Sequence, residues 1–98
     1  VKFHCEAEVV PWEVRAQEWF FAALPADVSE EIREFPRMPR GFGAVAVVAT
    51  IGTSTWRTSI FPDAQRGTYV LPLKKTVSIA ENIRHGDWVT LRLDVSDG

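Results

Sequence analysis

The sequence has 98 residues, of which 46% are hydrophobic and 24% are charged, with a formal net charge of -2. This length and apolar content predict one globular domain over residues 1–98 and argue against a disordered chain. The longest apolar run, Val45 to Ala49, is too short to cross a bilayer, and no basic start precedes an apolar signal segment. We therefore expect a cytoplasmic protein with no membrane association.

The charges are unevenly divided along the chain. Residues 1–34 carry eight acids and three bases, whereas residues 35–98 carry five acids and eight bases. Neither part contains the basic stripe that nucleic-acid binding needs. Cys5 is the single cysteine, so an internal disulfide is excluded, and its place in an alternating pattern predicts an inward, inert side chain.

The first part of the chain predicts two strands and a short helix. Residues 3–9 alternate between apolar and polar, as in a strand with one wet face, and Pro11 is expected to end that strand or to put a bulge near its edge. Residues 19–24 form a second, more apolar strand that stops at Pro25. Apolar residues then recur at helical spacing over residues 28–35.

The middle of the chain predicts a loop and a hairpin. The prolines and glycine of residues 36–41 are typical of a loop. Residues 45–51 are rich in β-branched side chains on both faces, which indicates a central strand. Gly52 and Thr53 predict a tight turn into a strand over residues 54–61.

The last part of the chain predicts a strand, a helix and a strand. Residues 69–71 form a short strand that Pro72 is expected to end. A helix follows, with an inner face of Leu73, Val77 and Ala80, and Asn82 suits a left-handed cap after it. Residues 88–95 alternate, with Trp88 outward, where we expect it to pack against this helix.

Leu24-Pro25 and Leu71-Pro72 each end an apolar run and precede a helical pattern. This internal echo indicates two related halves that close one barrel, which removes the exposed edges of a β-rich chain. The fold expected from the sequence is mainly β. It is a single closed or split β-barrel of about six to seven strands with two short capping helices.

Several segments of the chain resemble a bacterial family of domains of unknown function. The most specific are Gly-x-x-x-Trp-Arg-x-Ser over residues 52–59 and the Gly-Asp pair at residues 86–87. Other members of the family stand alone or are fused to a bacteriocin-protection-type domain. The resemblance covers nearly the whole chain and implies a double-split barrel like that of the AbrB-like transition regulators, with both halves in one chain. This chain departs from the pattern at Ser78, where relatives carry Arg, and at Asn82, where they often carry Gly.

The sequence carries weaker patterns for metal binding and catalysis. Three side chains on the solvent-facing side of the first strand could bind a metal ion: His4, Glu6 and Glu8. Nearby there is only one imidazole, and no CxxC or HxxxH spacing, so a solvated strand face is favoured. A triad would have to come from Ser54, Ser59, His85 and Asp87. No nucleophile elbow accompanies them, so an enzyme, such as a small hydrolase, is the least favoured function.

DNA binding is a rival hypothesis that rests on the resemblance, because AbrB-like barrels grip DNA with basic loops. The available cations are Arg37, Arg40, Lys74, Lys75, Arg84 and Arg92. They are scattered in a chain that is acidic overall, and single basic residues usually only solvate a surface.

The favoured function is a non-catalytic binding module without a cofactor or metal, acting as a monomer or weak dimer. Its predicted site consists of Trp56, Arg57, Ser59, Lys74 and Lys75. Arg57 and Ser59 share a strand face and the lysines begin a helix, so a small anion or a partner's acidic segment could bind there. In the competing interpretation, Trp56 belongs to the core and Arg57 pairs with an acid such as Glu81 or Asp87.

Overall fold

The computed structural model of the protein describes residues 1–12, 19–34 and 43–95. These ranges contain six strands and two helices: β1 (Lys2–Trp12), β2 (Trp19–Ala23), α1 (Ala26–Glu34), β3 (Val45–Ile51), β4 (Ser54–Asp63), β5 (Thr68–Leu73), α2 (Lys75–Ala80) and β6 (Trp88–Val95). The loop predicted for residues 36–41, with Arg37 and Arg40, lies outside the described residues, as does the end of the first helical pattern at Phe35.

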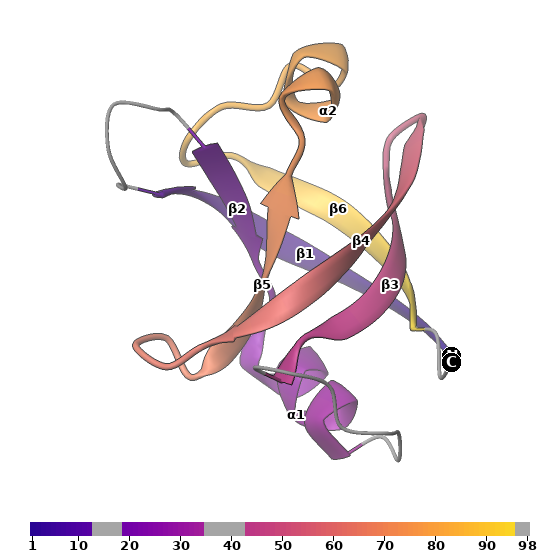
Figure 1. Ribbon diagram of the computed structural model, residues 1–98. Helices are drawn as coiled ribbons and strands as arrows, with labels where there is room; N and C mark the ends of the chain where they lie inside the picture. Colours follow the sequence, from indigo (N-terminus) through magenta and orange to yellow (C-terminus); the bar gives the residue numbers. More distant parts are fainter. Residues whose placement is uncertain (13–18, 35–42, 96–98) are drawn as a thin grey trace.

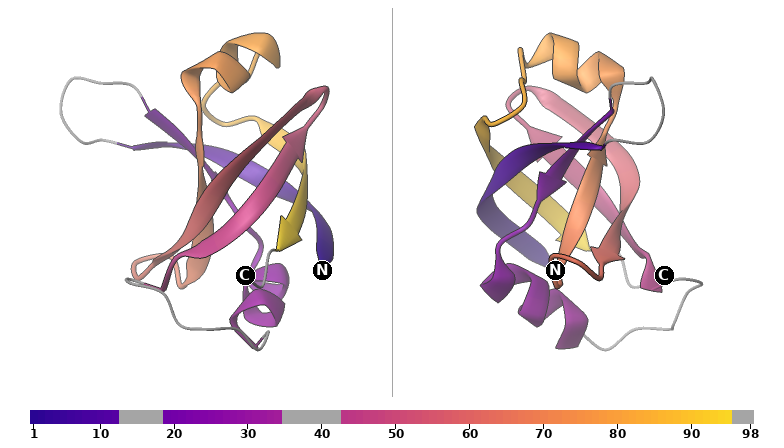
Figure 2. Two further views of the ribbon diagram at one scale, coloured as in Figure 1. Left: turned by 45° about the vertical axis from the view of Figure 1, so that its right-hand side comes forward. Right: turned by 90° about the vertical axis from the view of Figure 1, so that its left-hand side faces the viewer.

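The six strands form a closed antiparallel barrel in the order β1-β2-β5-β4-β3-β6. The two helices lie at opposite ends of this barrel (Figures 1 and 2). The mainly β fold with a closed barrel and two short helices is therefore confirmed. Neither helix is long and apolar enough to span a membrane.

The strand order contains an internal symmetry. Exchanging β1 with β4, β2 with β5 and β3 with β6 leaves every strand beside the same neighbours. β1 and β4 also divide their pairing in the same way. The first part of β1 pairs with β6 and its last part with β2, while the first part of β4 pairs with β3 and its last three residues with β5. This is the arrangement expected from the repeated Leu-Pro segments.

Two prolines expected to end strands do not do so. Pro11 lies inside β1 opposite Phe20, and Pro72 lies inside β5 opposite Phe21. The β1–β6 ladder stops at Glu8, and the β4–β5 ladder stops at the pair of Phe61 and Val70. Each proline therefore sits where its strand pairs on one side only, which is the kind of strand position that tolerates proline.

The barrel interior is filled by alternate residues of each strand. Burial alternates without exception along β3, and in β6 the side chains of Leu91, Leu93 and Val95 point inward as predicted. A fully buried Leu or Ile contributes roughly 1.5–3 kcal/mol of transfer free energy. Cys5 packs against the edge of this core and is half-buried, in agreement with its predicted inward direction.

The helix α1 is held at one end of the barrel by two fully buried side chains, Ser29 and Ile32. The hydroxyl of Ser29 accepts a hydrogen bond of 3.0 Å from the backbone N–H of Tyr69 in β5. A buried serine was not expected from the sequence. Its acceptor fixes the helix to the barrel in a way that apolar packing alone would not.

The helix α2 is shorter and buries only Val77. Ala80, expected on its inner face, is exposed, and Ile83 after the helix is buried instead. Asn82 adopts φ 53°, which confirms the left-handed position predicted for it. Glu81 accepts a hydrogen bond of 2.7 Å from the Ser54 hydroxyl, so the end of α2 is tied to the turn between β3 and β4.

Trp88 does not pack against α2 as expected, because its side chain is 66% exposed. The helix covers the end of the barrel, whereas Trp88 begins β6 and points outward from the barrel wall, opposite Glu8 of β1. A helix of six residues at the end of the barrel is too short to extend along the wall as far as Trp88.

Candidate functional site

Four consecutive strands of the barrel, β1, β6, β3 and β4, share one outer face. Their registers place the outward side chains in two rows that run across the strands. The first row is Lys2, Asp94, Val48 and Arg57, and the second row is His4, Arg92, Thr50 and Thr55. Neighbouring strands lie about 4.8 Å apart, so each row spans about 14 Å. We refer to these eight residues as the two-row face.

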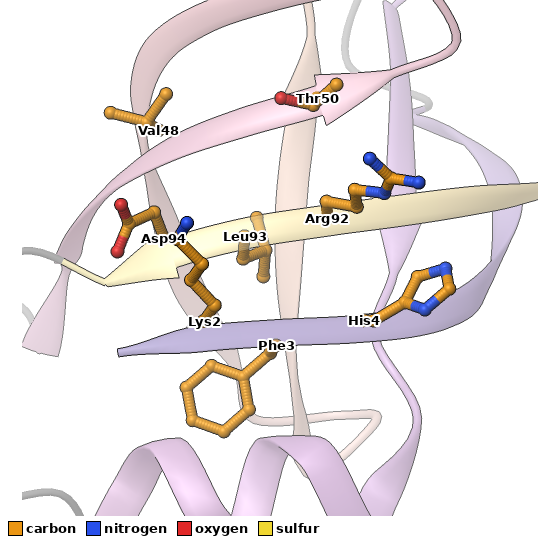
Figure 3. A pocket seen from close by; sticks show the side chains of 8 residues that line it. All are labelled: Lys2, Phe3, His4, Val48, Thr50, Arg92, Leu93 and Asp94. Carbon is orange, nitrogen blue, oxygen red and sulfur yellow. The ribbon is translucent and has the colours of Figure 1, made fainter.

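The two-row face contains a hollow of about 510 Å³. It is lined by the members of both rows on β1, β6 and β3, together with Phe3 and Leu93 (Figure 3). This volume lies within the range of about 300–1,000 Å³ that is typical of ligand pockets. In Figure 3, His4 and Arg92 project from adjacent strands at one end of the hollow, and Lys2 and Asp94 lie at the other.

The charge of the two-row face is positive. It carries Lys2, Arg57 and Arg92 against one carboxylate, Asp94, with the imidazole of His4 beside Arg92. Within the described ranges, no side-chain hydrogen bond or ion pair occupies the guanidinium groups of Arg57 and Arg92. Both keep their donors for an external acceptor, and planar guanidinium groups suit carboxylate and phosphate oxygens.

Two residues of the predicted site, Arg57 and Ser59, lie on the outward side of β4. Arg57 is exposed and belongs to the first row, opposite Val48, while Ser59 is half-buried opposite Ala46. The acids that could have neutralised Arg57 have other partners. Glu81 accepts hydrogen bonds from Thr53 and Ser54, and Asp87 accepts one from the backbone N–H of Arg84.

The third predicted residue, Trp56, points inward and belongs to the core, with 8% of its surface exposed. It therefore lies on the opposite side of β4 from Arg57. Its indole N–H is buried and has no hydrogen-bond partner in the part of the chain that the structure describes. Trp56 supports the barrel wall beneath Arg57 and does not contribute to the outer surface.

The two predicted lysines are exposed at the start of α2. The β4–β5 ladder covers only the residues from Phe61 to Asp63 on β4, and beyond it the two strands separate toward α2 (Figures 1 and 2). Lys74 and Lys75 therefore follow β5, a strand that is not part of the two-row face. Ligand binding by this pair stays a prediction.

The residues weighed for a metal or a triad have other surroundings. Glu6 of β1 accepts a hydrogen bond of 2.8 Å from the Thr90 hydroxyl, and Ser54 is engaged with Glu81. No group of three His, Cys, Asp or Glu side chains among residues 1–12, 19–34 and 43–95 is arranged to hold a metal ion. His85 is exposed in the segment between α2 and β6.

Sequence reasoning missed the association of His4 with Arg92 and Thr50. His4 was considered only as a metal ligand, and Arg92 was counted among scattered cations. Both fall on the polar side of their alternating patterns, which gave their direction but not their neighbours. The missing information was that the first and last strands pair. From the sequence, that pairing follows from closure of the barrel and not from any local pattern.

Comparison with family models gives a match to the family described as Domain of unknown function (DUF1905), over residues 6–93. The match extends from the middle of β1 into β6 and so covers the whole circuit of the barrel. A comparison with curated proteins gives no match.

Proposed function

The chain belongs to this family of domains of unknown function, and from the geometry of its outer surface we propose that it is a non-catalytic binding module for an anionic ligand. The observation that supports the proposal is the hollow in the two-row face, which is lined by Lys2, Arg92 and a single carboxylate, Asp94, with Arg57 on the neighbouring strand of the same face. The ligand class is a small carboxylate or phosphate anion, or the acidic segment of a partner protein.

Each part of the face has a role in the proposed binding. Arg92 lies at one end of the hollow, between His4 and Thr50 in the second row, and supplies a planar pair of donors to one anionic group. Lys2 and Arg57 flank the hollow in the other row and attract further negative charge. Ser59 extends the face along β4, and Lys74 and Lys75 add positive charge nearer α2.

Finer features of the resemblance belong to the same proposal. We propose that the barrel is of the double-split type found in AbrB-like regulators, because β1 and β4 each divide their pairing between two partners. A bacterial source, a cytoplasmic location and a monomeric or weakly dimeric state are expected with it.

The test is titration of the isotope-labelled protein with inorganic phosphate and with a hexaglutamate peptide at low salt, followed by NMR. We expect saturable shifts at Arg92 and Thr50 and a loss of affinity of about tenfold in Arg92→Ala, as for a charge-assisted hydrogen bond. Arg57→Ala should cost less, because Arg57 lies at the rim. Arg84→Ala is the matched control, since Arg84 is exposed in the segment before β6.

Equal losses in Arg92→Ala and Arg84→Ala, or no saturable shift with either probe, would refute the proposal. A short DNA duplex distinguishes the rival regulator. Tight binding whose logarithm falls steeply with the logarithm of salt concentration would favour a DNA-binding function instead. Turnover that requires His85 or Asp87 would favour the enzyme.

A further inference from the structure

A second hollow lies on a different part of the barrel wall and has the opposite charge. It measures about 370 Å³ and is formed where β6, β1, β2 and β5 adjoin. Its apolar floor includes Leu24 and Pro25, and its walls include Glu6, Glu8 and Trp88. We call it the Trp88 hollow.

Trp88 and Glu8 are direct cross-strand partners, and Glu6 lies two residues along the same face of β1. Directly opposed residues of antiparallel strands have Cβ atoms about 5 Å apart, so an indole face and two carboxylates border one space. Glu6 uses one oxygen for the Thr90 hydroxyl, which leaves its remaining acceptor sites for a ligand.

The Trp88 hollow is negative despite the presence of a basic residue. Arg66 also lines it, but the Arg66 side chain lies 3.6 Å from the Asp63 carboxylate. The remaining charges are the two glutamates on β1. The adjoining helix α1 is acidic as well, with Asp27, Glu30, Glu31 and Glu34 against Arg33.

Two backbone hydrogen bonds to Val9 of β1 fix the segment that precedes Trp88. The N–H of Val9 donates to the Asp87 carbonyl at 2.8 Å, and the N–H of Gly86 donates to the Val9 carbonyl at 2.9 Å. The backbone that carries the exposed Trp88 ring is therefore already ordered, so binding has to fix only the side-chain torsions of the tryptophan.

From these features we infer that the Trp88 hollow binds a basic segment of a partner protein, with an arginine or lysine side chain seated between Trp88 and the glutamates. An indole ring is the best aromatic surface for a cation, and carboxylates beside it satisfy the donors of the same cation. The charge of the site excludes the acidic ligand proposed for the two-row face, so this is a separate interaction.

The experiment uses a pentapeptide, acetyl-Gly-Arg-Gly-Arg-Gly-amide, and the same peptide with glutamine in place of arginine. Binding to the labelled protein at low salt is followed through the backbone amide signals of Val9 and Thr90, which every variant retains, and through the indole N–H signal wherever Trp88 is present. We expect saturable shifts with the arginine peptide only. The dissociation constant should rise about tenfold in Trp88→Ala and about threefold in Glu8→Gln, from loss of the cation–π contact and of one charge pair.

Glu31→Gln is the matched control, because it removes one exposed carboxylate of α1 that does not line the hollow, and it should lower the affinity less than Glu8→Gln does. Equal shifts with the glutamine peptide, equal losses in Glu8→Gln and Glu31→Gln, or no saturable shift would overturn the inference. Concentration-dependent self-association that Trp88→Ala abolishes would assign the hollow to a second copy of this chain and would overturn it too.

Discussion

The two halves of the barrel share one connectivity but differ in what they present to solvent. In the first half, the outward side chains of β1 pass from Lys2 and His4 to Glu6 and Glu8. In the second half, the corresponding outward side of β4 carries Arg57, Ser59 and Phe61. Inward positions are mainly apolar in both, with Thr58 of β4 as a polar exception. The comparison teaches that the inward pattern specifies the barrel, while the outward residues of the two halves differ in charge and polarity.

The helices differ as much as the strands. α1 has nine residues and buries Ser29 and Ile32, whereas α2 has six residues and buries only Val77. The first half therefore closes its end of the barrel mainly by packing. The second closes its end in part by the hydrogen bonds from Thr53 and Ser54 to Glu81.

The largest expected effect comes from comparing the loss of one isoleucine in α1 with the loss of one isoleucine in α2. Ile32→Ala should lower the free energy of unfolding by about 3 kcal/mol, because Ile32 is fully buried and its removal leaves a cavity. Ile79→Ala should change it by less than about 0.5 kcal/mol, because Ile79 is 70% exposed. Urea unfolding measures both. Similar losses would show that α2 packs more closely than its exposure indicates.

The next effect concerns the turn that joins the halves. Gly52→Ala should cost about 2 kcal/mol, since Gly52 has φ 58° and a Cβ there would displace the Glu81 carboxylate from Ser54. Gly67→Ala is the control. Gly67 has φ 72° and open space around it, so only the backbone cost of about 1 kcal/mol applies.

Thermal unfolding of both alanine variants, with and without Glu81→Ala, isolates the contact. The added cost of Gly52→Ala over Gly67→Ala should vanish when Glu81 is absent. If the difference persists in the Glu81→Ala background, the tie between α2 and this turn contributes nothing to stability.

A smaller effect is expected at the end of α2. Asn82→Ala should cost about 1 kcal/mol, because alanine lacks the tolerance of asparagine for positive φ, whereas Asn82→Gly should stay within about 0.5 kcal/mol of the parent. Chemical denaturation of the two variants provides the comparison. A larger cost for glycine than for alanine would mean that the Asn82 side chain has a separate role.

The smallest effect on stability concerns Cys5 in β1. Burial, and then the negative charges of Asp27 and Glu6, raise the pKa of its thiol to about 11. The folded state thus holds a proton that the unfolded chain releases, so this contribution is present below about pH 9 and is lost as the pH rises to about 11.

The same shift predicts slow chemistry at the Cys5 thiol. With the pKa raised from 9.0 to about 11, the thiolate fraction at pH 8 falls about 100-fold. Alkylation by iodoacetamide should be slower by at least that factor in the folded protein than in urea. Asp27→Asn should raise the folded rate and Glu31→Asn should not. Equal folded and unfolded rates would contradict the raised pKa.

Much of the fold could be predicted because inward and outward residues alternate clearly. β3 and the turn at Gly52 follow from β-branched content and turn chemistry, and the repeated Leu-Pro segments indicated two halves. Pro11 and Pro72 were misread because a proline is tolerated in a strand that pairs on one side, and pairing is a tertiary property. Single-sequence patterns do not reveal which part of a strand lacks a second neighbour.

The candidate site was less accessible to prediction. Arg57 and Ser59 were placed correctly on one strand face. Lys74 and Lys75 were added to the same site because they follow soon after in the chain, but β4 and β5 separate before the lysines are reached. His4 and Arg92 are 88 residues apart and meet only through the pairing of β1 with β6. A hollow on a barrel wall depends on side chains from three strands, so the alternation of one strand does not predict it.

The pairing of β1 with β6 has a consequence for synthesis of the protein. Cys5 lies opposite Leu91, so the barrel closes only after the last strand has left the ribosome. Neither half holds a complete set of strand partners, because β1 relies on β6 and β3 relies on β4 and β6. Such distant contacts slow folding. Until β6 arrives, β1 keeps an unpaired edge, and an unpaired edge of this kind is prone to aggregation.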